Sequence, residues 1–356
     1  MKLYSNFEND IRTDKTVPGS YERWYFDAVS YDKRYRIVVI FYEGNPFSAK
    51  YIKNLRSKRE GDKSRAFFYP ALSISVYEDN KTIFDSQSEY PNEECSFGSD
   101  EIYIRIGNNE LTALQDDGDI IYSLNLVEEL PSGDRLIADL SFKSEECGNL
   151  TNNHQALGGH LWNLAQPKAN VSGRIYIYQG SRIVHRIKMA GLGYHDHSIG
   201  RVPLKNQYVD WYWGRFHFDA GTLIYYVMNH KEGQQHKAWL IDPFNQTCLM
   251  EYDQVKISET QLNRFLLAPK RKIEMKNAES QVYIHQNQVL DSGPIFMRFS
   301  ADAILHLEKN NIVSKSTGNT EYIKPSRISS RIFSPLLNRG KRNSDERTNW
   351  IRKIWK

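Results

Sequence analysis

Residues 120–142 of the chain read IIYSLNLVEELPSGDRLIADLSF, and this stretch indicates the fold most directly. Apolar side chains recur at every second position before Ser132-Gly133, and again after it from Leu136 to Phe142. Alternation with period two is typical of β-strands, and Ser-Gly is typical of turns. The stretch therefore predicts two antiparallel strands joined by a tight turn.

The same alternation recurs through most of the chain. It is found at 72–76, 102–106, 175–177, 222–229, 271–276, 281–284 and 295–307. Turn dipeptides such as Asp79-Asn80 and Asp117-Gly118 separate the runs. Helical periodicity is scarce before the tail, and 261–267 is the best short candidate for a helix. Many antiparallel strands joined by tight turns predict an all-β barrel or sandwich, and 356 residues are enough for two of them.

Aromatic residues make up 13% of the chain, with 22 Tyr, 16 Phe and 7 Trp. Tyr and Trp suit half-buried strands, and they line sites for apolar ligands. We therefore expect the partner of this protein to be a hydrophobic small molecule.

The net charge of +4 is distributed unevenly along the chain. From Arg327 to the end there are nine Lys/Arg and two Asp/Glu, a net charge of +7. The first 326 residues therefore carry 38 basic and 41 acidic groups, a net charge of −3. A folded region with a net negative charge is a poor match for a phosphate backbone, so we expect no binding of nucleic acid by the first 326 residues.

The cellular compartment is predicted from three features that the sequence does not show: paired cysteines, a membrane span and a secretory signal. Cys95, Cys147 and Cys248 are widely spaced and form no C-x-x-C unit, which disfavours a disulfide framework or a zinc cluster. The apolar run 37–42 is much shorter than the roughly 18 residues of a membrane span. Residues 1–14 are polar and contain no secretory signal. These features predict a cytoplasmic protein.

The C-terminal tail has a pattern of its own. A linker at 338–344 precedes Trp350, Ile351, Ile354 and Trp355, which recur at helical spacing among Arg and Lys residues. A short basic helix with Trp on its apolar face suits the anionic inner face of a membrane. We therefore expect either peripheral membrane contact through 340–356 or docking of this helix on the barrel.

Two segments depart from the plain strand pattern by their polar and aromatic content. The first is SYERWYFDA at 20–28, where Trp24 and Phe26 share one face of an extended strand. The second is GHLWN at 159–163, where His160 and Trp162 share one face and place a proton acceptor beside a large π-surface. A core strand and a structural histidine are the alternative interpretations of these two segments.

The third segment is GLGYHDHSIG at 191–200. On a strand, Tyr194, Asp196 and Ser198 point to one face while His195 and His197 point to the other. An H-x-H pair can bind a metal, but no carboxylate follows it within five positions. The pattern favours an acid–base site over a structural hydrogen-bond network, and a metal site has the least support.

Several cofactor chemistries have no sequence motif here. The chain contains neither G-x-x-x-x-G-K-[ST] nor a strand-following G-x-G-x-x-G, and no G-x-S-x-G elbow. We therefore expect activity without a nucleotide cofactor or a metal.

Taken together, the three segments resemble the carotenoid 1,2-hydratase/AttH-like lipocalin superfamily. The similarity covers roughly 18–307 and includes the W-x-W-G-R run at 211–215. It implies two lipocalin-like β-barrel domains in tandem, and a function among carotenoid hydratases, terpenoid cyclases and Diels–Alderase-type cyclases. In the hydratases the functional group is a His and a Trp two apart plus a Tyr and an Asp two apart. These correspond here to His160, Trp162, Tyr194 and Asp196.

The chain departs from the family pattern at three positions. Ser198 and Ile199 follow Y-H-D-H where the family usually has Asn and an aromatic residue, and Arg23 stands where many members have a second Trp. These changes alter the polar and aromatic lining that the resemblance implies. We assign substrate contacts to other residues of the shared motifs, namely Trp24, Phe26, His195, His197, Trp211, Trp213 and Arg215.

The resulting hypothesis is a cofactor-independent enzyme that protonates a C=C bond of a polyene or isoprenoid. Capture of the cation by water gives hydration, and internal capture gives cyclisation. Asp196 is the predicted acid and Tyr194 its hydrogen-bonding partner, because burial in an apolar barrel keeps a carboxyl protonated near pH 7. His160 is the predicted base or water-orienting group, and Trp162 a wall for the cation. A pericyclic cyclase and a non-catalytic carrier of a hydrophobic ligand are the alternatives.

The predicted domain organisation has three parts. Residues 1–200 form an N-terminal lipocalin-like domain with the catalytic motif, and 201–335 form a C-terminal lipocalin-like domain. The basic amphipathic tail occupies 336–356 and includes a short C-terminal helix. Residues 200–206, which contain Pro203, are the predicted hinge.

Overall fold

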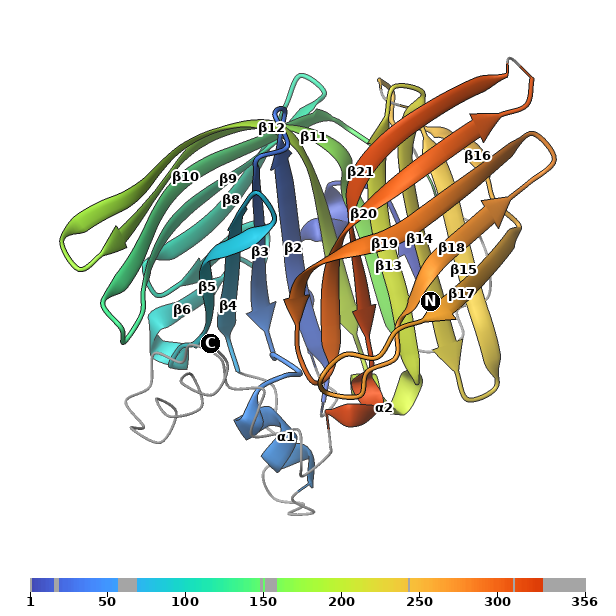
Figure 1. Cartoon of the computed structure of the whole chain (residues 1–356). Helices are drawn as coiled ribbons and strands as arrows, with labels where there is room; N and C mark the ends of the chain where they lie inside the picture. Colours follow the sequence, from blue (N-terminus) through green and yellow to red (C-terminus); the bar gives the residue numbers. More distant parts are fainter. Residues whose placement is uncertain are drawn as a thin grey trace.

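The computed structural model describes residues 2–328, except 16–18, 57–68, 148–149, 151–158, 243 and 310. Its strands form two curled antiparallel sheets that lie side by side (Figure 1). The predicted all-β fold of two tandem lipocalin-like units is therefore confirmed. The hairpin predicted at 120–142 is present as β9 and β10, where Leu126 pairs with Ala138.

The first sheet runs in the order β5-β4-β3-β2-β12-β11-β10-β9-β8-β7-β6, and β1 adds a parallel pairing to β11. The bounds of its strands are β1 (Lys2–Tyr4), β2 (Tyr21–Ser30), β3 (Tyr35–Glu43), β4 (Ala71–Glu78), β5 (Lys81–Glu89), β6 (Cys95–Phe97), β7 (Tyr103–Ile106), β8 (Asn109–Asp116), β9 (Asp119–Glu129), β10 (Asp134–Glu145), β11 (His160–Gln179) and β12 (Arg182–Gly200).

The second sheet runs in the order β16-β15-β14-β13-β21-β20-β19-β18-β17. The bounds of its strands are β13 (Asp210–Phe218), β14 (Gly221–His230), β15 (Gly233–Ile241), β16 (Cys248–Glu251), β17 (Gln254–Thr260), β18 (Lys270–Lys276), β19 (Ser280–Ser292), β20 (Phe296–Leu307) and β21 (Ile312–Ile323).

In the residues that the structure describes, helical structure is limited to short elements outside the strands. These are α1 (Ala49–Arg56), α2 (Leu204–Gln207), and the 3-10 turns η1 (Glu8–Asp10), η3 (Asn92–Glu94) and η4 (Pro325–Arg327). The helix expected at 261–267 is wrong, because this segment is a loop between β17 and β18. The hinge expected at 200–206 contains the start of α2, which connects the two sheets. The predicted tail and its helix at 336–356 lie outside the described residues.

Each sheet buries one face in a core of its own. In the first sheet this core includes Trp24, Phe26, Tyr122 and Phe142, with Asp10 of η1 hydrogen-bonded to the Tyr122 hydroxyl inside it. A comparable apolar cluster fills the inner face of the second sheet. The alternation that predicted the strands thus accounts for both interiors.

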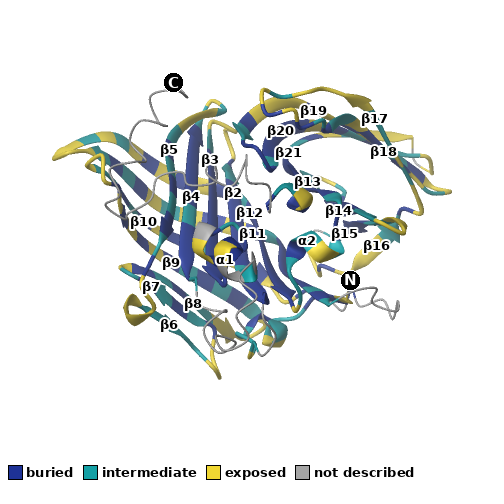
Figure 2. Ribbon diagram, turned by 90° about the horizontal axis from the view of Figure 1, so that it is seen from below, coloured by how far each residue is buried: buried dark blue, intermediate teal, exposed yellow. Residues whose placement is uncertain are grey.

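A third apolar cluster lies between the two sheets and takes side chains from both. Tyr25 and Tyr194 come from the first sheet, and Trp213 and Tyr226 from the second. Figure 1 shows α1 and α2 at the lower end of the molecule, and Figure 2, seen from this end, shows them in front of the central strands, which have long buried stretches. Both faces of β2 and of the second half of β12, residues 191–200, are therefore buried. Among the helices in the described ranges, none has the length and apolar character that crossing a bilayer requires.

Candidate active site

Two neighbouring strands of the first sheet, β11 and β12, present the predicted catalytic residues on one face. Ser198 of β12 pairs with Trp162 of β11 on one side and with Arg23 of β2 on the other. Asp196 pairs with Tyr25 of β2. Since side chains two apart share a face, this face is shared by His160 and Trp162 on β11 and by Tyr194, Asp196 and Ser198 on β12.

A glycine allows the aromatic and imidazole groups of this face to meet. A Cβ on Gly200 would lie 2.0 Å from the ring of Tyr21, so only glycine lets this ring lie across β12. The Tyr21 hydroxyl thereby reaches Nδ1 of His160, at 2.9 Å. Tyr21 and Gly200 therefore fix the orientation of the predicted base.

This face forms one wall of a cavity, and the second sheet forms the opposite wall. The cavity measures about 530 Å³ including its mouth. Its lining includes Arg23, His160, Trp162 and Ser198 from the first sheet and Trp211, Trp213 and Tyr226 from the second. We predict from the sequence that Asp196 is buried in an apolar barrel, whereas in the structure apolar side chains fill the interior of the first sheet and the cavity lies between the sheets.

Asp196 lies directly behind the cavity wall. Its carboxyl group is 2% exposed and accepts a hydrogen bond from the Tyr194 hydroxyl at 2.8 Å. The Ser198 hydroxyl contacts its other oxygen at 3.4 Å, and the Trp162 indole is a further hydrogen-bond partner. Burial raises the pKa of Asp196 above its usual 3.8, and it outweighs the opposing effects of Arg23 and the hydrogen bonds. The group is therefore suited to carry a proton at a higher pH than an exposed carboxyl.

His160 differs from Asp196 in its protonation. Burial and the nearby Arg23 guanidinium lower the pKa of His160 to about 3. The imidazole is therefore neutral over the whole physiological range. A neutral ring on the cavity wall can accept a proton or orient a water molecule.

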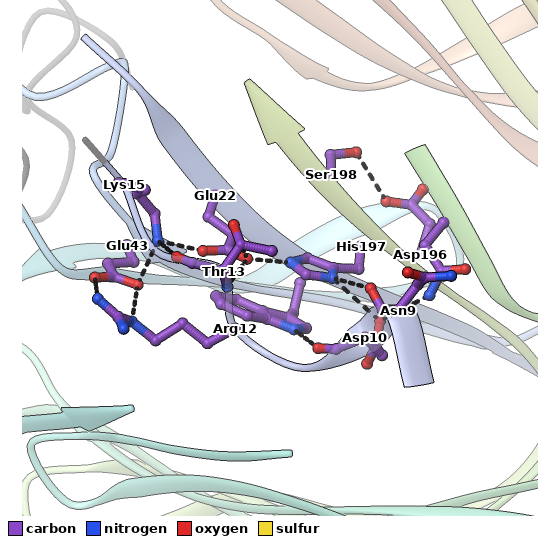
Figure 3. Close-up of polar contacts among 12 residues, drawn as sticks. Asn9, Asp10, Arg12, Thr13, Lys15, Glu22, Glu43, Asp196, His197 and Ser198 are labelled. Atoms are coloured by element: carbon purple, nitrogen blue, oxygen red, sulfur yellow. Dashed lines mark hydrogen bonds and ion pairs between the residues drawn. The ribbon is translucent and has the colours of Figure 1, made fainter. Parts of the chain in front are cut away.

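The two histidines of the H-D-H motif lie on the opposite face of β12, as strand alternation predicts. His195 Nε2 is 2.9 Å from Asp10 Oδ2, and His197 Nε2 is 2.8 Å from Glu22 Oε1. In Figure 3 Asp196 and Ser198 are joined to each other, whereas the His197 ring is directed towards Glu22 and Asn9. Within the described ranges, no group of three or more His, Cys, Asp or Glu side chains is placed to hold a metal ion.

Four of the expected substrate contacts belong to this other face. The His195 ring stacks on Phe26 with centroids 3.8 Å apart, and the His197 ring stacks on Trp24 at 4.4 Å. Trp24 and Phe26 belong to the core of the first sheet, and none of the four lines the cavity. These four side chains support β12 from the core side. Asp10 holds the His195 ring and Glu22 holds the His197 ring, so neither ring is directed towards the cavity.

Arg215 joins the two sheets beside the cavity. Its guanidinium donates hydrogen bonds from Nε and Nη2 to Asp27 Oδ1, with the Nε contact at 2.8 Å. Both side chains are buried, and the Tyr25 hydroxyl donates to the other oxygen of Asp27 at 3.2 Å. Arg215 is thus committed to an ion pair across the seam and does not line the cavity, whereas Trp211 and Trp213 do.

Sequence reasoning missed Arg23 and Ser198 as residues of the site. Both line the cavity, and Arg23 also lines a second cavity of about 760 Å³ that lies next to it. The available signal was the departure of these positions from the family pattern. Tyr226 was missed as well, because nothing in its local sequence shows that β14 faces the first sheet.

The fold is that of a tandem lipocalin-like protein. The family model described as carotenoid hydratase CrtC matches residues 94–348. The chain therefore belongs to the CrtC carotenoid hydratase family. The description of this family supports a hydratase role for this chain.

Individual relatives are consistent with this assignment. The chain is 26% identical over 346 residues to hydroxyneurosporene dehydrogenase of Chlorobaculum tepidum, covering 89% of this chain and 86% of that protein. It resembles the crystal structure of CghA with Sch210972 at a TM-score of 0.58 and 11% identity, covering 90% of this chain and 98% of the other. It also resembles a putative AttH from Nitrosomonas europaea at a TM-score of 0.58 and 14% identity, covering 89% and 94%. At these identities the two structures show a shared fold.

Proposed function

We propose that this enzyme protonates a C=C bond of a hydrophobic polyene or isoprenoid, and that water or an internal nucleophile then captures the cation. The observation that carries the proposal is a buried carboxyl of raised pKa, Asp196, directly behind an aromatic cavity. Protonation of an alkene needs an acid that keeps its proton near neutral pH. The family's name supports a carotenoid-type polyene as the substrate.

The proton starts on Asp196 and reaches the cavity through Ser198. The Ser198 hydroxyl contacts the carboxyl group and lines the cavity, so it can accept the proton of Asp196 while giving its own to the alkene carbon. The carboxylate left behind is stabilised by the Tyr194 hydroxyl and by the nearby Arg23 guanidinium. Asp196 is thus the acid and Ser198 the connecting group.

The cation that forms is surrounded by π-faces from both sheets. Trp162, Trp211, Trp213 and Tyr226 line the cavity, and each face contributes about 0.5–2 kcal/mol to a desolvated cation. The apolar lining also limits access of bulk water, which lets a single placed nucleophile react.

His160 directs the capture step. Its ring is neutral, and Tyr21 engages Nδ1, which leaves Nε2 as the nitrogen to bind water in the cavity. Attack of this water on the cation forms the C–O bond, and the released proton passes to Nε2 of His160, whose Nδ1–H donates to Tyr21 in this tautomer. Exchange with solvent then removes the proton from His160 and restores the proton of Asp196. The net reaction adds one water across the double bond. When an internal alkene or hydroxyl occupies this place, the product is cyclic and has the mass of the substrate.

The test compares Asp196→Asn with Asp139→Asn, an exposed aspartate on β10, using an acyclic polyene in detergent micelles. Asn keeps the size and hydrogen bonding of Asp196 but cannot transfer the proton, so turnover falls about 10²–10⁴-fold. The control variant keeps the wild-type rate. In deuterated water the wild-type product carries one deuterium at the protonated carbon.

The product distinguishes this proposal from its alternatives. Hydration adds the mass of one water, and cyclisation changes the chromatographic retention alone. An Asp196→Asn enzyme with near-normal turnover and no deuterium in its product indicates a pericyclic cyclase and refutes the proposal. Recovery of unchanged ligand indicates a carrier, and a product lighter by two hydrogens indicates the dehydrogenase activity for which the Chlorobaculum relative is named.

A further inference from the structure

One end of the molecule gathers four connecting segments around the seam between the sheets. They are 44–55, which includes most of α1, 201–208, which includes α2, the loop 261–269 and 324–328, which includes η4. We call these four segments the basic end. Seen from below in Figure 2, α1 and α2 both lie at this end of the seam.

The charge of the basic end is of one sign. Its four segments contain no Asp or Glu, and their basic residues are Lys50, Lys53, Arg201, Lys205, Arg264, Lys324 and Arg327. Lys50, Lys53, Arg201 and Arg264 are exposed. The first 326 residues as a whole carry a net charge of −3, so this concentration of positive charge is local. Such a surface is complementary to an anionic one.

The loop 261–269 adds an apolar element to this charged surface. Leu262 is 63% exposed and Leu266 is 67% exposed, with the exposed Arg264 between them. The backbone of Leu266 has a φ of +58°, which is uncommon for a residue other than glycine. An exposed leucine contributes nothing to the core, so burial does not account for either side chain at this place.

Hydrogen bonds hold the loop in this shape. The Asn263 side-chain oxygen accepts from the backbone N–H groups of Phe265 and Leu267, each at 2.9 Å. The Arg327 guanidinium donates to the carbonyl oxygens of Phe265 at 2.6 Å and Leu266 at 2.7 Å. The two exposed leucines are therefore presented by a fixed loop.

The same contacts tie the loop to the cavity walls. Asn263 Nδ2 donates to Ser292 Oγ at 3.0 Å and to the Gly293 carbonyl at 3.2 Å. The next residue, Pro294, lines the second cavity, and Leu204 of α2 lines the first. The basic end therefore lies where the walls of both cavities end.

We propose that the basic end docks on the surface of an anionic phospholipid bilayer, with Leu262 and Leu266 inserted among the lipid chains. Lysine and arginine side chains bind the headgroups, while the leucines enter the apolar layer below. The proposal rests on the proposed function in one respect, since a lipophilic polyene is dissolved in the membrane and would enter the cavities from this end. This surface differs from the tail at 340–356, and the two contacts are separable by mutation.

The experiment measures co-sedimentation of the full-length protein with vesicles of phosphatidylcholine and phosphatidylglycerol, and with vesicles of phosphatidylcholine alone. The test variant is Leu262→Gln/Leu266→Asn, because Asn tolerates the positive φ at 266. The matched control is Leu114→Gln/Leu249→Gln, which removes two exposed leucines from β8 and β16. We expect binding of wild type and control to the anionic vesicles, and binding of the loop variant weaker by about tenfold.

A second pair of measurements separates this inference from the proposed function. With polyene supplied in detergent micelles, the loop variant turns over at the wild-type rate, whereas with polyene embedded in anionic vesicles its rate falls together with its binding. Unchanged vesicle binding of the loop variant overturns the inference, and so does equal binding of wild type to neutral and anionic vesicles. Absence of turnover by wild type in micelles would overturn the proposed function while leaving the vesicle result to stand.

Discussion

Removal of Asp27 is the substitution that we expect to destabilise this protein most clearly. Asp27 accepts two hydrogen bonds from Arg215 across the seam and one from the Tyr25 hydroxyl. Arg215 is 1% exposed and Asp27 is fully buried. Asp27→Leu therefore leaves a buried guanidinium without its counter-ion, which typically costs about 3–5 kcal/mol of the free energy of unfolding. The Tyr25 hydroxyl loses its acceptor as well, for about another 1 kcal/mol.

The reverse substitution, Arg215→Met, is expected to cost less, for two structural reasons. First, the carboxyl group of Asp27 keeps the hydrogen bond from the Tyr25 hydroxyl in Arg215→Met, whereas in Asp27→Leu the guanidinium loses both of its hydrogen bonds at this pair. Second, Arg36 lies near the pair, and burial together with Arg215 lowers the pKa of Arg36 to about 10. Removal of Arg215 relieves this repulsion, while removal of Asp27 takes away the group that offsets it. We expect a cost of about 1–3 kcal/mol for Arg215→Met.

The assay is urea unfolding at pH 7, followed by tryptophan fluorescence and circular dichroism, of both single variants and Asp27→Leu/Arg215→Met. The double variant, which has no buried charge at this pair, is expected to be more stable than Asp27→Leu by at least about 1 kcal/mol. Equal costs for the two single variants would refute this reasoning.

Three further predictions concern activity and binding. Because burial raises the pKa of Asp196, kcat/KM should fall as the pH rises through that pKa. His160, whose pKa is about 3, should add no inflection to the pH profile between pH 5 and 8. An inflection near 6.5 that disappears in His160→Gln would contradict this assignment. Treatment with a chelator should leave turnover intact, and its loss with rescue by one specific metal would instead identify His195 and His197 as ligands. Deletion of 340–356 should weaken binding to anionic liposomes while circular dichroism and unfolding stay the same, and full binding without the tail would refute its role as an anchor.

The sequence by itself determined the strands and the composition of each strand face. Period-two alternation requires no long-range information, so β9 and β10 were predicted from 120–142 alone. The same rule places Tyr194 and Asp196 on one face of β12, and His195 and His197 on the other. His160 and Trp162 share a face for the same reason. The segment at 261–267 was predicted wrongly, because its leucines have helical spacing but are held in a loop by Asn263 and Arg327.

The tertiary structure alone decided what each of these faces packs against. Both faces of β2 and of residues 191–200 of β12 are buried, so polarity could not show which one encloses the ligand cavity. The face with Trp24 and Phe26 packs into the interior of the first sheet, and the face with Asp196 packs against the second sheet. The walls contributed by Trp213 and Tyr226 come from strands remote in sequence. Alternation specifies which side chains share a face, whereas the partner of that face depends on how the two sheets pack, which is a long-range property of the whole chain.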